Sequence, residues 1–141
     1  MSLFVRPIAA LTIVTSLLAC STDSNLTASQ QTAERLRGTW AEPTTFPGES
    51  FSMTLDIQDT TVTGTGYFSY EAGPAGTLSI TGTVSGQQVD LDVTYSTGWE
   101  EHFRGGVQLT VFSGDSWRTP VGDPAPFTLK RTTPPPGATP L

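Results

Sequence analysis

The residues with the clearest chemical potential are Glu100, Glu101 and His102, where two carboxylates precede the single histidine of the chain. A carboxylate and an imidazole can together bind a divalent metal ion. Neighbouring residues of a β-strand point to opposite faces, so Glu100 and His102 could converge but Glu101 could not join them. Two ligands do not make a closed metal site, and we expect a solvent-facing His102 and no metal. Glu101 shares the parity of Trp99 and Phe103, which makes it a candidate functional carboxylate near the interior.

A second pattern, Gly114-Asp115-Ser116, is similar to the residues around the nucleophile of some hydrolases. A serine nucleophile needs an oriented base and donors for an oxyanion, and His102 is the one histidine that could serve as the base. Glycine beside Asp-Ser is also ordinary turn chemistry, and no Gly-x-Ser-x-Gly elbow is present. The sequence therefore predicts a protein that is not an enzyme and that uses no cofactor.

The single cysteine, Cys20, follows an apolar run from Pro7 to Ala19 that is too short to span a membrane. Such a run fits the apolar region of a secretory signal peptide. Its last residues, Leu17-Leu18-Ala19-Cys20, resemble the lipobox of bacterial lipoproteins. The resemblance implies cleavage after residue 19, lipidation of Cys20 (palmitate among the acyl chains), and a membrane partner bound through that anchor. It also implies a place in the bacterial cell envelope, and Ser21 in the next position favours the outer membrane.

Composition narrows the remaining possibilities for the chain after the signal peptide. The 141 residues include 14 Gly and 11 Pro but are only 14% charged, which favours strands and turns. A net charge of −6 argues against nucleic acid as a partner, because phosphate binding needs clustered basic side chains. One cysteine permits neither an intramolecular disulfide nor a cysteine-based zinc cluster.

Strict alternation of apolar and polar residues recurs along the middle of the chain, as in Phe51-Ser52-Met53-Thr54-Leu55. Period two indicates half-buried antiparallel strands, and short connections indicate that consecutive strands pair. The strands are expected at 36–41, 50–58, 61–70, 75–85, 87–97, 100–106, 107–113 and 125–132. We therefore expect a signal peptide at 1–19, a lipidated flexible tether at 20–35, a β-domain at 36–131 and a disordered Pro-rich tail at 132–141. Residues 32–37 could form one helical turn before the first strand.

Features at the two ends of this series favour closure of the sheet on itself. The first strand contains Gly38-Thr39-Trp40, and the last carries Arg131 at the parity of Phe127. This pairing resembles the lipocalin and avidin superfamily of small barrels, in which the tryptophan plugs one end and a basic residue packs across it. Glycines at inward parity, such as Gly64 and Gly82, would permit the sharp coiling of a small barrel. The fold predicted is all-β, an antiparallel meander of about eight strands closed into a small lipocalin-like barrel.

The interior of that barrel is expected to be aromatic, and two functions remain open for it. By parity, the residues that could line a ligand site are Phe51, Phe68, Tyr70, Tyr95, Trp99 and Phe103. A barrel of eight strands can be filled by its own side chains or can leave room for one small ligand. A filled barrel implies a structural or protein-interaction role with another envelope protein as partner, whereas an open one implies binding of a small apolar or amphipathic ligand.

Overall fold

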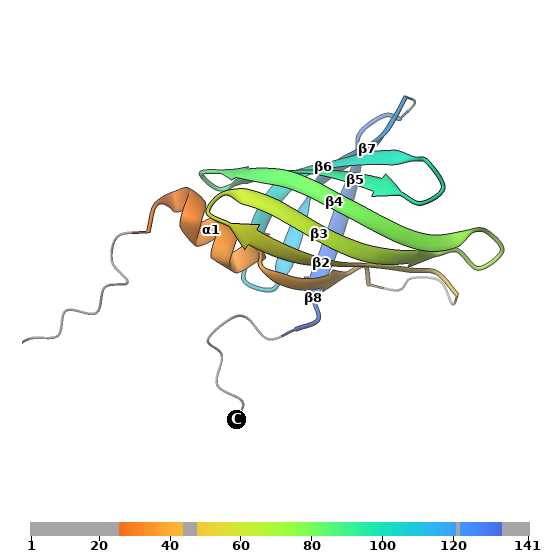
Figure 1. The fold of residues 1–141 in the computed structure, drawn as a ribbon, viewed down its shortest axis with the longest axis horizontal. Coiled ribbons are helices and arrows are strands. Elements are labelled where there is room, and N and C mark those ends of the chain that lie inside the picture. The colour runs from red at the N-terminus through yellow and green to blue at the C-terminus, as the bar shows by residue number, and fades with distance from the viewer. Residues whose placement is uncertain (1–25, 44–47, 121, 134–141) are drawn as a thin grey trace, which may run out of the picture.

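The structure, a computed structural model, describes residues 26–43, 48–120 and 122–133. One helix precedes eight antiparallel strands that pair in sequence order and close into a barrel (Figure 1), as the sequence predicts. The elements are α1 (Ala28–Leu36), β1 (Gly38–Ala41), β2 (Ser50–Gln58), β3 (Thr61–Ser69), β4 (Ala75–Ser85), β5 (Gln88–Tyr95), β6 (Glu100–Gln108), β7 (Val111–Thr119) and β8 (Ala125–Arg131).

The alternation that predicts the strands also decides which side chains fill the barrel. In β2, Met53, Leu55 and Ile57 are buried, whereas Thr54 and Asp56 between them are exposed. Alternate residues of a strand lie on opposite faces, so each strand supplies one apolar row to a shared core. The same pattern in β3 to β6 makes the core continuous along the barrel.

Glycines stand where neighbouring strands approach too closely for a side chain. A Cβ on Gly66 would lie 2.2 Å from the carbonyl oxygen of Ser52. On β7, a Cβ on Gly114 would lie 2.0 Å from the carbonyl oxygen of Arg104, and Gly114 pairs directly with Gly105 of β6. These positions let a barrel of eight strands coil tightly, as the inward parity of the glycines indicates.

The flexible tether expected at 20–35 is wrong from residue 28 onward. Helix α1 begins at Ala28 and not near residue 32. Thr27 accepts a hydrogen bond from the backbone of Gln30, whose side chain accepts one from the Thr27 backbone, and this capping box fixes the start of the helix. Leu36 and Ala33 are buried against the barrel, and α1 contacts β2, β4 and β6. The helix therefore covers one end of the barrel (Figure 1).

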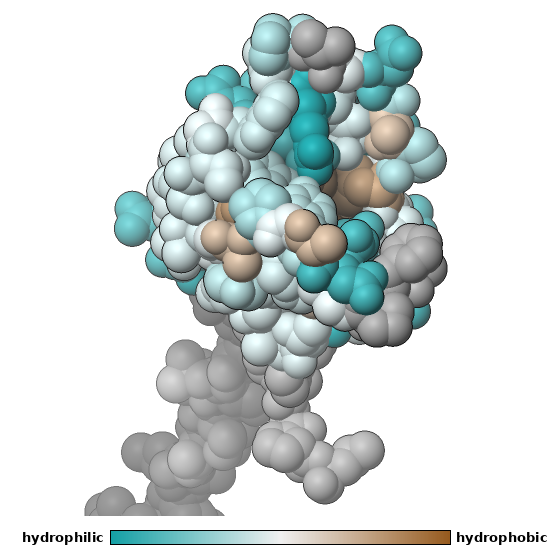
Figure 2. All heavy atoms as spheres, turned by 90° about the vertical axis from the view of Figure 1, so that its right-hand side faces the viewer, coloured by the Kyte–Doolittle hydropathy of each residue, from teal (hydrophilic) through white to brown (hydrophobic). Residues whose placement is uncertain are grey.

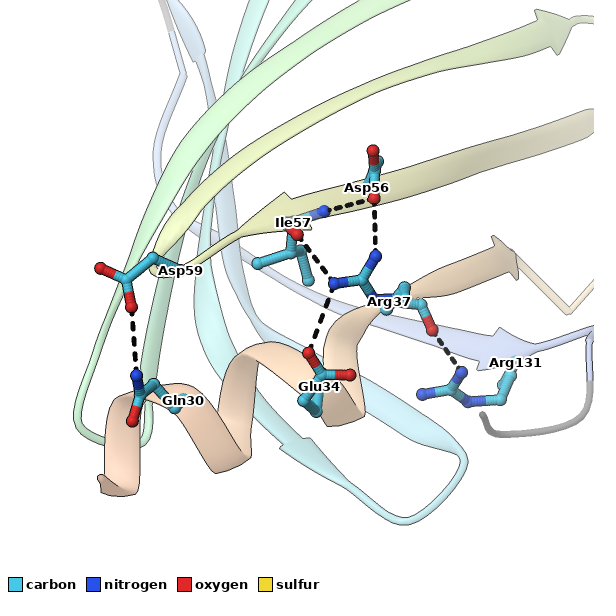
Figure 3. A network of polar contacts seen from close by, with 7 residues as sticks. All are labelled: Gln30, Glu34, Arg37, Asp56, Ile57, Asp59 and Arg131. Carbon is cyan, nitrogen blue, oxygen red and sulfur yellow. Dashed lines mark hydrogen bonds and ion pairs between the residues drawn. The ribbon is translucent and has the colours of Figure 1, made fainter. Parts of the chain in front are cut away.

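The barrel closes where β1 meets β8. Trp40 pairs with Arg131 across this seam, and the Arg131 guanidinium lies 4.6 Å from the Trp40 ring centre, so the contact expected from the sequence is present. Arg131 also donates hydrogen bonds to the carbonyls of Arg35 and Arg37 at the end of α1. Figure 3 shows this end, where Arg37 is held by Glu34 and Asp56. One cluster thus ties together the first strand, the last strand and the helix.

The hairpin between β6 and β7 lies elsewhere than expected. The turn is Leu109-Thr110, so strands at 100–106 and 107–113 are wrong, and Gly114 belongs to a strand and not to a turn. The reason is that the chain reverses at Leu109, which has φ 51° and is 87% exposed. Phe112, and not Val111, continues the buried row after this reversal.

Several expectations concern residues near the ends of the described ranges or outside them. The predicted signal peptide at 1–19, Cys20 and residues 134–141 of the predicted tail lie outside the described residues. Thr132 and Thr133, placed in the tail by the sequence, hydrogen-bond to Thr39 and extend the seam. Within the described residues, no helix has the length and apolar character needed to cross a membrane.

Candidate functional site

The end of the barrel opposite α1 is hollow. A cavity of about 480 Å³ opens there, lined by the C-terminal ends of β3, β5 and β7, the N-terminal ends of β2, β6 and β8, and residues just after β1. Figure 2 looks onto this end and shows apolar surface in a recess between hydrophilic side chains. We call this cavity the mouth. Its volume falls within the range of ~300–1,000 Å³ that is usual for small-molecule sites.

Two groups of aromatic side chains form the walls of the mouth. Phe51 stacks on Phe103 with ring centres 5.9 Å apart, and Phe127 meets Phe103 edge to face at 4.9 Å. On the other wall, Phe68 packs edge to face on Tyr95 at 4.9 Å. Each contact lies in the range of ~4.5–7 Å at which aromatic pairs attract. The walls are therefore flat, apolar and held rigidly by one another.

A polar cluster crosses the mouth among these rings. The Tyr95 hydroxyl donates to Glu101 Oε2 at 2.7 Å, and Arg118 Nε approaches the same oxygen at 3.4 Å. Arg118 also donates to the Tyr70 hydroxyl at 3.0 Å. The Glu101 side chain is 12% exposed, whereas that of Arg118 is 48% exposed. The cluster thus runs from a nearly buried carboxylate to a guanidinium at the opening.

Burial and charge shift the pKa values of groups in the mouth. Burial raises the pKa of Tyr95, and the charge and hydrogen bond of Glu101 raise it further. Burial also raises the pKa of Glu42, which the negative charges of Glu101 and Glu49 reinforce. Burial alone would lower the pKa of Arg118, but the nearby Glu101 and Tyr70 outweigh it and leave that pKa raised. The raised pKa of Glu42 therefore shows that the negative charges near this carboxylate are not fully compensated.

The structure brings together most of the aromatic residues that the sequence singles out as lining. Phe51, Phe68, Tyr70, Tyr95 and Phe103 all line the mouth. Trp99 does not, because it lies beside the β5–β6 turn and is 53% exposed.

Glu101 lines the mouth, but the sequence does not predict its partner Arg118. Arg118 belongs to β7, and the strand expected from the sequence in this region ends before it, at residue 113. The alternation Phe112, Gly114, Ser116, Arg118 is the signal that could have found it.

The two residues weighed for hydrolysis lie on opposite faces of the barrel. Ser116 is buried and lines the mouth, whereas His102 lies on the outer wall. There His102 contacts Asp92 through Nδ1 and lies 2.9 Å from Thr119 Oγ1 through Nε2. This order of acid, imidazole and hydroxyl is one that nucleophilic enzymes use. In the described part of the chain, however, neither the mouth nor the second cavity at the α1 end includes any of the three residues.

A second hollow of about 650 Å³ lies at the other end of the barrel, between α1 and the β6–β7 turn. Arg35 and the exposed Leu109 border it, and it carries no cluster of titratable groups. It offers less chemistry than the mouth despite its larger volume.

Three comparisons bear on identity. No protein-family model, no curated protein and no solved structure matched the chain.

Proposed function

We propose that this protein is a lipid-anchored protein of the bacterial cell envelope that binds a small amphipathic molecule in the mouth of its barrel. The observation that supports binding is the mouth itself, an open cavity of about 480 Å³ in a barrel whose other end is covered by α1. Small-molecule sites are typically apolar and aromatic with a few well-placed polar groups. The aromatic surface of the mouth comes from Phe51, Phe68 and Phe103, and its polar groups include Glu101 and Arg118.

The role is proposed to be binding without catalysis. A general acid or base must lie within reach of a substrate that is held in place. In the mouth, the nearly buried Glu101 is already engaged by Tyr95 and Arg118, and the hydroxyl of Ser116 has no imidazole beside it in the described structure. This arrangement suits recognition of a ligand more than turnover.

The anchor part of the proposal rests on the lipobox resemblance of Leu17 to Cys20. Residues 20–26 would span at most ~25 Å when fully extended, so an acylated Cys20 would keep α1 near the bilayer. The mouth opens at the end away from α1, and a ligand would then enter from the aqueous side. Cys20→Ser should abolish labelling by a fatty-acid probe and release the protein from membranes. Unchanged labelling and membrane partition would refute the anchor.

Binding is tested by native mass spectrometry of the protein purified from its own host. We expect a retained small molecule in the wild-type protein and its loss in Ser116→Phe, because Ser116 lies on the wall of the mouth and a phenyl ring would fill the space. Ser79→Phe on the outer face of β4 is the matched control and should retain the molecule. Circular dichroism of both variants checks that they fold.

The competing hypothesis is a structural or protein-interaction role. A wild-type protein without a bound molecule, together with an unaltered phenotype of Ser116→Phe in the host, would favour that hypothesis over ligand binding.

A further inference from the structure

The charges that line the mouth do not balance. Three carboxylates, those of Glu42, Glu49 and Glu101, line the cavity, and Arg118 is the one basic side chain among its described lining residues. Arg118 is already shared between Glu101 and the Tyr70 hydroxyl. Among the described residues, no basic side chain forms an ion pair with Glu42 or Glu49. The free mouth therefore carries an excess of negative charge at its opening.

The pKa of Glu42 reflects this excess of negative charge. Its pKa is raised by burial and by the charges of Glu101 and Glu49, which means that its ionised form lacks sufficient compensation. Glu42 directly follows β1 and Glu49 directly precedes β2, so the two carboxylates stand at the same side of the opening. A positive charge placed there would interact favourably with both.

The aromatic walls favour a positive charge for a separate reason. The π-faces of aromatic rings carry partial negative charge and attract cations within ~6 Å. Phe51, Phe68 and Phe103 all line the mouth, and Phe51 and Phe103 stack with 29° between their planes. Flat apolar walls of this kind accept a flat apolar group and also tolerate a cation beside it. A carboxylate ligand would instead have to compete with Glu101 for Arg118 and would be repelled by Glu42 and Glu49.

The spacing of the carboxylates argues for an organic cation over a metal ion. A divalent metal needs several oxygen or nitrogen ligands at ~2.0–2.6 Å, which requires their side chains to converge on one point. In the described residues, no three His, Cys, Asp or Glu side chains are grouped closely enough for that. Dispersed carboxylates around apolar walls suit a charge that is spread over a larger group.

We propose that the ligand of the mouth is an amphipathic organic cation, with a protonated or quaternary amine at the carboxylates of Glu42 and Glu49 and a flat apolar body against Phe51 and Phe103. This inference rests on the proposed function and narrows it to one chemical class of ligand.

The test compares three probes that share one aromatic body and differ in charge: naphthylmethylamine, which is a cation at neutral pH, naphthylmethanol, and naphthoate. Titration calorimetry on the purified full chain at low ionic strength gives a dissociation constant for each. We expect the amine to bind about tenfold more tightly than the alcohol, and the carboxylate to bind most weakly. Added salt should weaken binding of the amine and leave binding of the alcohol nearly unchanged.

Variants show whether the mouth is responsible for this preference. Glu42→Gln combined with Glu49→Gln should reduce the advantage of the amine over the alcohol to about threefold or less and leave the affinity of the alcohol unchanged. Asp115→Asn removes a carboxylate from the outer wall of β7 and should leave the preference intact.

Each result has a distinct meaning. Equal affinity for amine and alcohol, tighter binding of naphthoate, or a preference that survives loss of both carboxylates would overturn the cation inference while ligand binding in the mouth stands. Absence of binding by all three probes would overturn both the inference and the proposed function.

Discussion

Replacement of Arg131 by methionine should loosen the closed end of the barrel. Arg131 packs its guanidinium 4.6 Å from the Trp40 ring and donates hydrogen bonds to the carbonyls of Arg35 and Arg37. Those carbonyls belong to the last turn of α1 and the residue after it, where a helix leaves acceptors without partners and where positive charge is favourable. Methionine keeps the length and apolar character of the side chain but removes every donor and the charge.

The expected loss follows from these contacts. A hydrogen bond to a charged group contributes ~1.5–3 kcal/mol, and a cation–π contact contributes ~0.5–2 kcal/mol. Part of this is offset, because burial disfavours the charge of Arg131 and lowers its pKa, and because methionine buries apolar surface equally well. We expect Arg131→Met to lower the free energy of unfolding by about 2–3 kcal/mol.

Urea unfolding measures this loss as a shift of the midpoint at unchanged slope. Lys130→Met on the exposed face of the same strand is the matched control and should cost no more than ~0.5 kcal/mol. A double-mutant cycle with Trp40→Leu, which removes the ring, measures the coupling between the Trp40 and Arg131 side chains, expected at ~0.5–2 kcal/mol. If Arg131→Met and Lys130→Met cost the same, the closing cluster does not hold the barrel and the reasoning is wrong.

Three further outcomes are expected. Gly114→Ala should lower the free energy of unfolding, measured in urea, by at least ~2 kcal/mol, because the new Cβ would lie 2.0 Å from the carbonyl oxygen of Arg104. Gly106→Ala is the control and should leave the free energy of unfolding nearly unchanged, because its Cβ meets no atom closer than 3.5 Å. Glu42→Gln should raise the melting temperature at neutral pH. The pKa of Glu42 is higher in the folded than in the unfolded chain, so its ionised form disfavours folding, and the gain should vanish as the pH falls below the unfolded pKa. His102→Ala should leave ligand binding unchanged by calorimetry, since His102 lies outside the mouth; loss of binding would contradict that placement.

Much of this fold could be predicted from the sequence, because a sheet with one buried and one exposed face makes apolar and polar residues alternate along each strand. The alternation around Leu55 and the inward glycines are direct consequences of that geometry. Closure could be predicted as well, because Trp40 and Arg131 stand at the two ends of the strand series and pair across the seam.

The failures have equally specific causes. The turn at Leu109-Thr110 contains no Gly, Asn, Asp or Pro, so nothing in the local sequence marks the reversal. Misplacing it hid the strand that carries Arg118, and with it the partner of Glu101. Helix α1 is longer than the sequence predicts for the opposite reason: the capping box of Thr27 and Gln30 marks its start, but the polar residues around it are typical of a linker.

The contrast between the two ends of the barrel bears on why the mouth is polar. At the closed end, Trp40, Leu36 and Phe112 fill the space, and all three are fully buried. At the mouth, Glu101 is nearly buried, yet it sits among rings that could pack against an apolar residue. A buried ion pair is rarely more stabilising than apolar side chains of the same volume. Stability alone would therefore favour an apolar closure at both ends, and the charge kept at one end fits the ligand binding that we propose for the mouth.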